Sequence, residues 1–267
     1  MAQERRGTSH ADRVMRVLRV CHELPGDVQT LQAIAEATGF DPSVCHRILQ
    51  SCVADGYVER LGHGKYRLGS DAIQAGLLAM AGVTEHLDQH QILLDLQEDL
   101  GGIVVFYSLA PVGARRVATD YAKGDYNPAD FGMTAFDMFT VGCSLRTGAS
   151  GRTLLAYVPE PIREIALAEP IPETAGPGAM DNEELLASIK EIRKQGYAIG
   201  RQECLPGWDS VAVPALWGNT ALGVVLWLRP VGEGSDDVSD HVEAVSRAAR
   251  LISLAATAGG RNPSPTA

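Results

Sequence analysis

The sequence predicts a two-domain α+β protein, in which a small helical domain ending in a β-hairpin precedes a larger domain of strands and helices. In the first 70 residues, hydrophobic residues recur at helical spacing in three short runs, and a short alternating pattern follows. Beyond residue 100, strand-like runs rich in Val and Leu are interleaved with helical runs. A chain of 267 residues is long enough for two domains.

The composition is that of an ordinary globular protein, with 45% hydrophobic and 21% charged residues. No hydrophobic run approaches the roughly 20 residues that span a bilayer, and the first residues lack the apolar segment of a secretory signal. The five cysteines are scattered and contain no C-x-x-C pair, which argues against a disulfide framework. We therefore expect a cytoplasmic protein.

The charges are distributed unevenly along the chain. The whole sequence has 23 Lys and Arg against 33 Asp and Glu, a net charge of −10. Residues 1–70 contain nine basic and eight acidic residues, so the excess of acid lies in the remainder. A small first domain can therefore meet nucleic acid although the protein as a whole is acidic.

The first domain is predicted to begin with two helices. Residues 11–24 place apolar residues at the i, i+3, i+4, i+7 spacing of one helical face. Thr30 is a suitable N-cap for a second helix at residues 31–38, and Gly39 is a typical residue to end it. Residues 1–10 before these helices are predicted to be a disordered arm, because they are polar.

A third helix and a hairpin complete this domain, at residues 11–70. Asp41 is the predicted N-cap and Pro42 the first helical residue, and the helix continues to about Ala54. The run "YVERLGHGKYRLG" at residues 57–69 predicts two short strands around a turn. Helices in this order, with a glycine in the second turn and a hairpin afterwards, predict a winged helix-turn-helix.

The third helix is the predicted recognition helix, because four apolar residues on one face leave the other face to solvent. Arg pairs well with guanine and Gln with adenine, whereas Ser and His suit phosphates or base edges and Val a thymine methyl. Basic residues of the hairpin are expected to contact phosphates. The predicted DNA-binding residues are Ser43, Val44, His46, Arg47 and Gln50 in the helix and Arg60, His63, Lys65 and Arg67 in the hairpin.

A metal site is an alternative interpretation of the pairs Cys21-His22 and Cys45-His46. Adjacent residues in a helix point about 100° apart, so that one ion cannot easily bind both members of a pair. Cys21, Cys45 and Cys52 also fall on the apolar faces of their helices, where free cysteine is a common small hydrophobe. We therefore predict no metal site and no cofactor.

A connecting helix is predicted at residues 71–84, and its apolar residues Ile73, Leu77 and Leu78 favour packing on a partner chain or on the second domain. The second domain is predicted at residues 85–257, followed by a disordered tail at 258–267. Its predicted strands are 102–110, 115–122, 210–216 and 222–230, and its predicted helices are 150–158, 182–196 and 236–256.

Two features of the second domain suggest a binding site. Gly148, Ala149 and Ser150 precede or open a helix, where unpaired backbone N–H groups and the helix dipole suit a carboxylate. On the last strand, Trp227 and Arg229 share a face by alternation. The two side chains would either fill a cavity there, or recognise an aromatic or anionic ligand by stacking and a charge-assisted bond.

The first domain resembles the DNA-binding domain of the IclR family of bacterial transcription regulators, over "LQAIAEATGFDPSVCHRILQSCVADGYVERLGHGKYRLG". The second is similar to the GAF-like effector-binding domain of that family, over "RTGASGRTLLAYVPE", "GYAIGRQECLPGWDSVAVPAL" and "ALGVVLWLRP". The resemblance implies an antiparallel sheet flanked by helices in the second domain. It also implies a homodimer or a dimer of dimers (a homotetramer) that binds a double-stranded DNA operator, modulated by a small organic or aromatic acid.

The resemblance also implies effector-binding positions and shows two departures. Family members often have Lys followed by Ser or Thr at the start of the recognition helix, where this chain has Pro42 and Ser43. The family often has small residues that line the ligand cavity where this chain has Trp227 and Arg229. The effector-binding residues expected on these grounds are Thr147, Gly148, Ala149, Ser150, Trp208, Ser210, Trp227 and Arg229.

Two other classes of function are alternatives to a DNA-binding regulator. An enzyme is not expected, because "GASG" departs from G-x-S-x-G and the chain has no nucleotide-binding glycine motif. The second alternative is a metabolite sensor whose winged helix binds another protein. DNA binding would distinguish the two, because contacts with phosphate make affinity fall steeply with salt.

Overall fold

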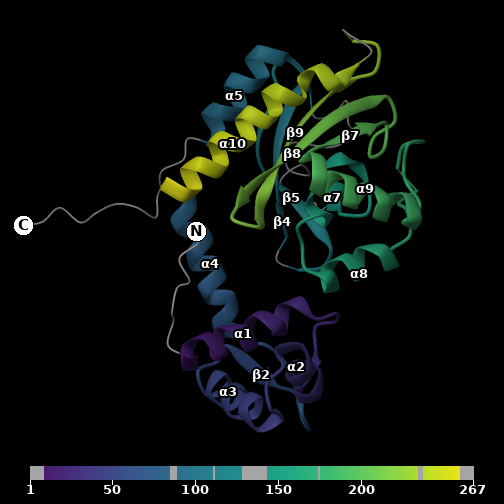
Figure 1. Ribbon diagram of the computed structural model, residues 1–267. Coiled ribbons are helices and arrows are strands. Elements are labelled where there is room, and N and C mark those ends of the chain that lie inside the picture. The colour runs from purple at the N-terminus through teal and green to yellow at the C-terminus, as the bar shows by residue number, and fades with distance from the viewer. Residues whose placement is uncertain are drawn as a thin grey trace, which may run out of the picture. The chain divides into compact units, whose positions relative to one another are not determined.

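The computed structural model describes residues 9–84, 89–110, 112–127, 143–173, 175–233 and 237–258. The chain forms two compact units that divide near Ala81 (Figure 1). The predicted two-domain α+β fold class is confirmed. Among the helices of the described residues, none is long and apolar enough to cross a membrane.

The N-terminal unit has helices at both ends and a small sheet. The elements in chain order are α1 (Ser9–Glu23), β1 (Gln29–Thr30), α2 (Leu31–Thr38), α3 (Pro42–Ala54), β2 (Val58–Arg60), β3 (Lys65–Leu68) and α4 (Ser70–Thr84). The strands form an antiparallel sheet in the order β1-β3-β2. Strands β2 and β3 are the predicted hairpin, whereas the two-residue strand β1 was not predicted.

Local sequence explains where α2 and α3 begin. The Thr30 hydroxyl accepts a hydrogen bond of 3.1 Å from the Ala33 N–H, and Gly39 ends α2 with a φ of +71°. A carboxylate oxygen of Asp41 accepts a hydrogen bond of 2.8 Å from the Ser43 N–H, and Pro42 is the first residue of α3. The predicted caps of both helices are confirmed.

The core of the N-terminal unit lies between α1, α2, α3 and the sheet. Val17, Ile34 and Leu49 are fully buried there, together with the free thiols of Cys21, Cys45 and Cys52. Burial, the largest cause, raises the pKa of the Cys21 thiol to about 11. The cysteines are therefore core residues, and the residues that the structure describes contain no group of side chains able to hold a metal ion.

The C-terminal unit is built on one antiparallel sheet in the order β6-β5-β4-β9-β8-β7. Its strands are β4 (Ile103–Leu109), β5 (Arg115–Ala122), β6 (Cys143–Ser144), β7 (Ala198–Arg201), β8 (Trp208–Trp217) and β9 (Thr220–Pro230). Its helices are α5 (Gln89–Leu100), α7 (Gly148–Leu155), α8 (Glu160–Ala168), α9 (Asn182–Gln195), the 3₁₀ helix η2 (Val238–His241) and α10 (Val242–Ala258). Helix α8 and the edge strands β6 and β7 were not predicted from the sequence.

Alternation along the strands divides this unit into two hydrophobic layers, one on each side of the sheet. Leu226 and Leu228 of β9 pack with residues of α7 and α9. Val225 and Trp227 of the same strand pack with residues of α5 and α10. Helices therefore cover both faces of the sheet (Figure 1).

Candidate functional sites

The outward face of α3 presents most of the side chains predicted to bind DNA. Ser43, Arg47 and Gln50 are exposed, and His46 is half-buried. Val44 is also half-buried, because it packs against the core of the N-terminal unit. The helix thus offers a guanidinium, an amide and an imidazole on its surface, a set that can read base edges in a major groove.

The start of α3 carries a negative charge. Hydrogen bonds from the side chain and backbone of Ser43, the two largest causes, lower the pKa of the Asp41 carboxyl. Asp41 is therefore ionised at neutral pH and engages the Ser43 hydroxyl that was predicted to contact DNA. The next residue, Pro42, adds no positive charge to offset it.

The hairpin presents its four predicted residues differently. Arg60, His63 and Lys65 are exposed, and Arg60 Nε donates a hydrogen bond of 3.3 Å to the Gly62 carbonyl. Arg67 is also exposed, but its guanidinium forms an ion pair of 2.7 Å with Glu59 on the neighbouring strand. The charge of Arg67 is therefore partly offset within the protein.

A cavity of about 50 Å³ lies at the start of α7, which we call the α7 cavity. Unlike α2, α3 and α9, helix α7 has no side-chain hydrogen bond from its N-cap residue, Thr147. The first N–H groups of a helix have no partner within the helix, and the first residues of α7, Gly148, Ala149 and Ser150, line this cavity. The cavity is lined by Tyr107, Arg116, Gly148, Ala149, Ser150, Glu203, Cys204, Leu205, Trp208, Ser210, Leu226 and Leu228.

Gly148 shapes the entrance of α7 by its backbone conformation. Its φ is +80°, and a Cβ atom there would lie 3.0 Å from Cys204 Cβ and 3.4 Å from Arg116 Nη2. A larger residue would be strained and would crowd both neighbours. Glycine therefore allows the chain to turn into α7 directly beside the cavity.

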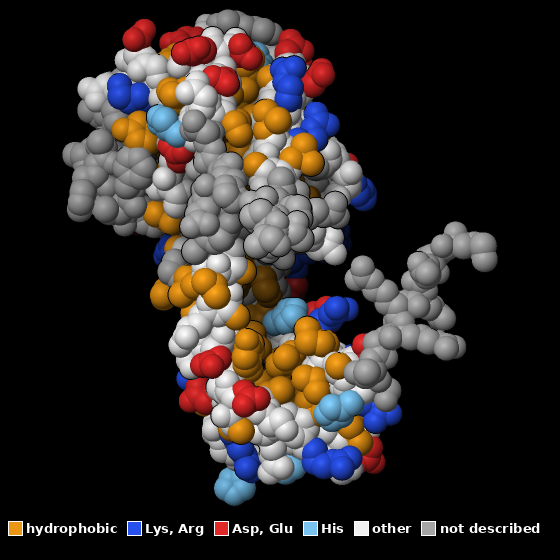
Figure 2. Space-filling model, turned by 90° about the vertical axis from the view of Figure 1, so that its left-hand side faces the viewer, with side chains coloured by type: hydrophobic (Ala, Val, Ile, Leu, Met, Phe, Trp, Pro, Cys, Tyr) orange, Lys and Arg blue, Asp and Glu red, His pale blue; other side chains and the backbone are white. Residues whose placement is uncertain are grey.

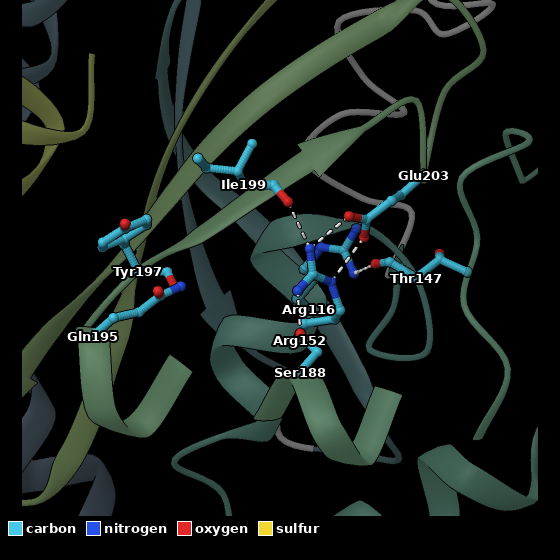
Figure 3. Close-up of polar contacts among 8 residues, drawn as sticks. All are labelled: Arg116, Thr147, Arg152, Ser188, Gln195, Tyr197, Ile199 and Glu203. Atoms are coloured by element: carbon cyan, nitrogen blue, oxygen red, sulfur yellow. Dashed lines mark hydrogen bonds and ion pairs between the residues drawn. The ribbon is translucent and has the colours of Figure 1, made fainter. Parts of the chain in front are cut away.

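Arg116 is a charged residue of the cavity that was not predicted from the sequence. It is only 2% exposed, and its Nη1 donates hydrogen bonds to the Ser144 carbonyl and, at 3.0 Å, to the Thr147 carbonyl. Its Nη2 lies 3.6 Å from Cys204 Sγ, and its Cζ lies 5.2 Å from the centre of the Tyr107 ring. The strand β5 thus brings a guanidinium to the beginning of α7 (Figure 3).

A buried ion pair lies next to Arg116. Arg152 Nε donates a hydrogen bond of 2.8 Å to Glu203, and the two side chains are 5% and 4% exposed. Arg152 also donates to Ser188 of α9 and to the Ile199 carbonyl of β7 (Figure 3). Because Arg152 neutralises Glu203, that carboxylate does not dominate the charge of the α7 cavity.

Trp208 forms another part of the cavity wall. The Tyr126 ring meets the Trp208 ring edge-on, with 5.7 Å between centroids, and the Tyr126 hydroxyl donates to Glu233. Burial first, and then the hydrogen bond to Glu233, raise the pKa of Tyr126 to about 12. The aromatic side of the cavity is therefore held in place by a neutral phenol.

Trp227 and Arg229 do not line this cavity, so their effector-binding role stays a prediction. The predicted alternation is present, but that side of β9 faces α5 and α10. Trp227 is fully buried there, stacks on His241 with 4.2 Å between ring centroids, and donates a hydrogen bond of 2.9 Å to the Gly101 carbonyl. Arg229 Cζ lies 5.4 Å from the Trp227 ring centre. Leu226 and Leu228 face the cavity instead.

The other predicted effector residues fall into two groups. Gly148, Ala149, Ser150, Trp208 and Ser210 line the α7 cavity. Thr147 is buried behind it, where its carbonyl holds Arg116. A run such as "RRVATDYA" predicts a strand but not which helix end its side chains reach, so no local signal identified Arg116.

Comparison with known proteins places both units in one family. Residues 10–62 match the model of the IclR helix-turn-helix domain, and residues 141–260 match the model of the bacterial transcriptional regulator IclR C-terminal domain. Together the two matches cover well over half of the chain. Regulator XynR of Escherichia coli is 23% identical over 212 residues, spanning 78% of this chain and 80% of XynR.

Solved structures of similar fold include an IclR homologue from Microbacterium hydrocarbonoxydans complexed with 4-hydroxybenzoate. It is 23% identical with a TM-score of 0.55, over 94% of this chain and all of the other. The Thermotoga maritima IclR is 21% identical with a TM-score of 0.53, over 93% and 98% of the two chains. The expectation of a DNA-binding regulator rather than an enzyme is confirmed. The chain belongs to the IclR family of transcriptional regulators, with a helix-turn-helix domain and a C-terminal effector-binding domain.

Proposed function

We propose that this regulator binds its operator as a dimer or a dimer of dimers and responds to a small organic acid in the α7 cavity. In this proposal residues 11–70 bind DNA through α3 and the hairpin, residues 71–84 connect the domains, and residues 85–257 bind the effector. Occupation of the cavity favours one arrangement of the protein over another and so changes operator affinity.

The observation that supports an acidic effector is the meeting of Arg116 with the start of α7. A guanidinium and the first N–H groups of a helix are both suited to a carboxylate, and burial strengthens both interactions. The hydroxyls of Ser150 and Ser210 add polar contacts, whereas Leu226 and Leu228 provide an apolar wall. This mixture suits a carboxylic acid with a short apolar body.

The size of the cavity favours a compact acid. About 50 Å³ of space accommodates a few non-hydrogen atoms. An aromatic acid such as 4-hydroxybenzoate, with which the Microbacterium homologue is complexed, is larger than this space. We therefore propose a short-chain carboxylic acid as the effector class.

Self-association is supported by exposed hydrophobic residues of α4. Ile73, Leu77 and Leu78 are 65%, 59% and 77% exposed, and hydrophobic side chains gather along α4 and on the N-terminal unit beside it (Figure 2). Apolar surface of this kind marks an interface more often than a free surface. A partner chain on this face would also place two recognition helices on one operator.

Calorimetric titration with short-chain carboxylic acids and with the matching amides tests the effector proposal. We expect the acids to bind and the neutral amides to bind at least tenfold more weakly, because only the acids make charge-assisted hydrogen bonds. Arg116→Gln should lose most of the affinity for the acid. Arg115→Gln is the matched control, because this neighbour is 41% exposed and pairs with Glu169. Equal binding of acid and amide would contradict the proposal.

DNA binding is tested by titrating a duplex at increasing salt concentration. We expect the affinity to fall steeply with salt, and Arg47→Ala to weaken binding to an operator selected from random duplexes. Salt-independent binding, or an Arg47→Ala variant that binds the selected operator unchanged, would instead favour a protein-interaction role for the winged helix.

A further inference from the structure

Two arginines of α1 converge on one aromatic ring of the N-terminal unit. The guanidinium carbons of Arg13 and Arg16 lie 5.9 and 5.5 Å from the centre of the Phe40 ring. Arg13 and Arg16 are three residues apart in α1, a spacing that places both on one side of a helix. Phe40 is half-buried and packs against the core, so its ring is a fixed platform for both cations.

This arrangement concentrates positive charge at the surface. Both arginines are exposed, and within the described part of the chain neither has a carboxylate within ion-pair distance. Two like charges on one ring repel each other, and an anion that bridges them would remove the repulsion. Guanidinium groups suit the oxygens of a phosphate in particular, because their donors match its geometry.

The position of the ring indicates which phosphates are in reach. Phe40 directly precedes Asp41, the N-cap of α3, so the two arginines flank the beginning of the recognition helix. In helix-turn-helix proteins the recognition helix enters the major groove by its N-terminal residues, and the DNA backbone passes beside it. The ionised Asp41 repels a phosphate there, and two guanidinium groups outweigh that single charge.

We propose that Arg13 and Arg16, positioned by Phe40, form a binding site for the DNA backbone phosphates that border the operator major groove. This inference rests on the proposed binding of DNA through α3. It also supplies a source of phosphate affinity at the helix start, where Asp41 and Pro42 provide no positive charge. Such contacts position the protein and strengthen binding to every sequence alike.

The test measures binding to a fluorescent random-sequence duplex over a series of salt concentrations. We compare Arg13→Gln and Arg16→Gln, singly and together, with Arg19→Gln. Arg19 is exposed on the same helix, and its substitution removes the same charge, but the described structure shows no contact between Arg19 and the Phe40 ring. All variants should keep the thermal midpoint of the wild type, because these side chains are exposed.

We expect each of Arg13→Gln and Arg16→Gln to lower affinity severalfold at about 0.1 M salt and to reduce the salt slope by roughly one per protomer. The double variant should reduce the slope by roughly two, and Arg19→Gln should leave it close to the wild-type value. The loss should be the same for the random duplex and for a selected operator, because phosphates carry no sequence information.

Phe40→Leu tests the platform separately from the charges. Leucine keeps an apolar side chain at this position but removes the ring that holds the two cations. We expect a fall in affinity smaller than that of the double arginine variant, with both charges still present. A Phe40→Leu protein that binds like the wild type would show that the ring does not position the arginines.

Two results would overturn the phosphate site, and they are distinguishable. If the wild type binds the duplex with a steep salt dependence but Arg16→Gln and Arg19→Gln reduce the slope equally, Arg13 and Arg16 are general surface charge. If the wild type itself binds without salt dependence, the proposed DNA binding fails and the phosphate site fails with it.

Discussion

Arginine residues of the N-terminal unit lie at the surface, whereas the C-terminal unit buries several of its own. Arg13, Arg16, Arg47 and Arg60 are all exposed. Arg116, Arg146 and Arg152 are all buried. Burial, the largest cause, lowers the pKa of Arg146, and the charge of Asp181 opposes that shift.

In the function proposed above, this difference corresponds to two kinds of anion. A DNA backbone is long and reached from solvent, so exposed and mobile cations suffice and salt competes with them. A small acid offers few contacts, so a cation that recognises it must be desolvated and fixed in place. Removing an exposed arginine is therefore expected to lower DNA affinity by a small step, whereas removing a buried arginine is also expected to destabilise the C-terminal unit.

The largest expected effect comes from breaking the buried ion pair. Arg152→Leu leaves Glu203 as an uncompensated carboxylate, because the pair is 5% and 4% exposed. We expect the free energy of unfolding of the C-terminal unit to fall by about 3–5 kcal/mol. Tryptophan fluorescence during urea denaturation measures this, since Trp208, Trp217 and Trp227 all lie in that unit.

The control for this prediction removes both charges. The double variant Arg152→Leu, Glu203→Leu contains no unpaired buried charge, so it should regain most of the lost stability. A single Arg152→Leu variant that unfolds at the wild-type urea concentration would show that buried arginines of this unit are no more critical than exposed ones.

Substitutions on the two faces of the C-terminal sheet are expected to have different effects, of intermediate size. Trp227→Phe removes the hydrogen bond of 2.9 Å to the Gly101 carbonyl and alters the stacking on His241. We expect the free energy of unfolding to fall by about 1–2 kcal/mol, with no change in effector affinity by calorimetry. Ser210→Ala, on the cavity side of the sheet, should weaken effector binding and leave the free energy of unfolding nearly unchanged. Weaker effector binding by Trp227→Phe would support the predicted role of Trp227 in effector binding.

The smallest effect concerns charge within the hairpin. Arg67 is paired at 2.7 Å with Glu59, whereas Lys65 on the same strand is exposed and forms no ion pair with any described residue. Arg67→Gln should therefore lower DNA affinity by no more than about twofold, because exposed pairs contribute little and Glu59 already screens the charge. Lys65→Gln should lower it more in the same titration. Equal losses would mean that the pair opens when DNA binds.

The sequence by itself determined the features that depend on neighbouring residues. Asp41 and Pro42 located the start of α3, because a side-chain cap and a fixed φ act within one turn of a helix. The spacing of Cys45, Ile48 and Leu49 identified the inner face of α3 and left Arg47 outside. Alternation likewise placed Trp227 and Arg229 on one face of β9. These patterns are local, so folding could not change them.

Only the tertiary structure decided which face of the sheet meets α7 and which distant side chains reach the two sites. Alternation along β9 does not say which of its two faces lies on the α7 side. In the structure α7 packs against the face of Leu226, and α10 packs against the face of Trp227. Arg116 reaches the Thr147 carbonyl across 31 residues of sequence, and Arg13 and Arg16 meet Phe40 only because α1 packs beside the turn before α3. Such contacts depend on how whole elements pack, which no spacing within one element specifies.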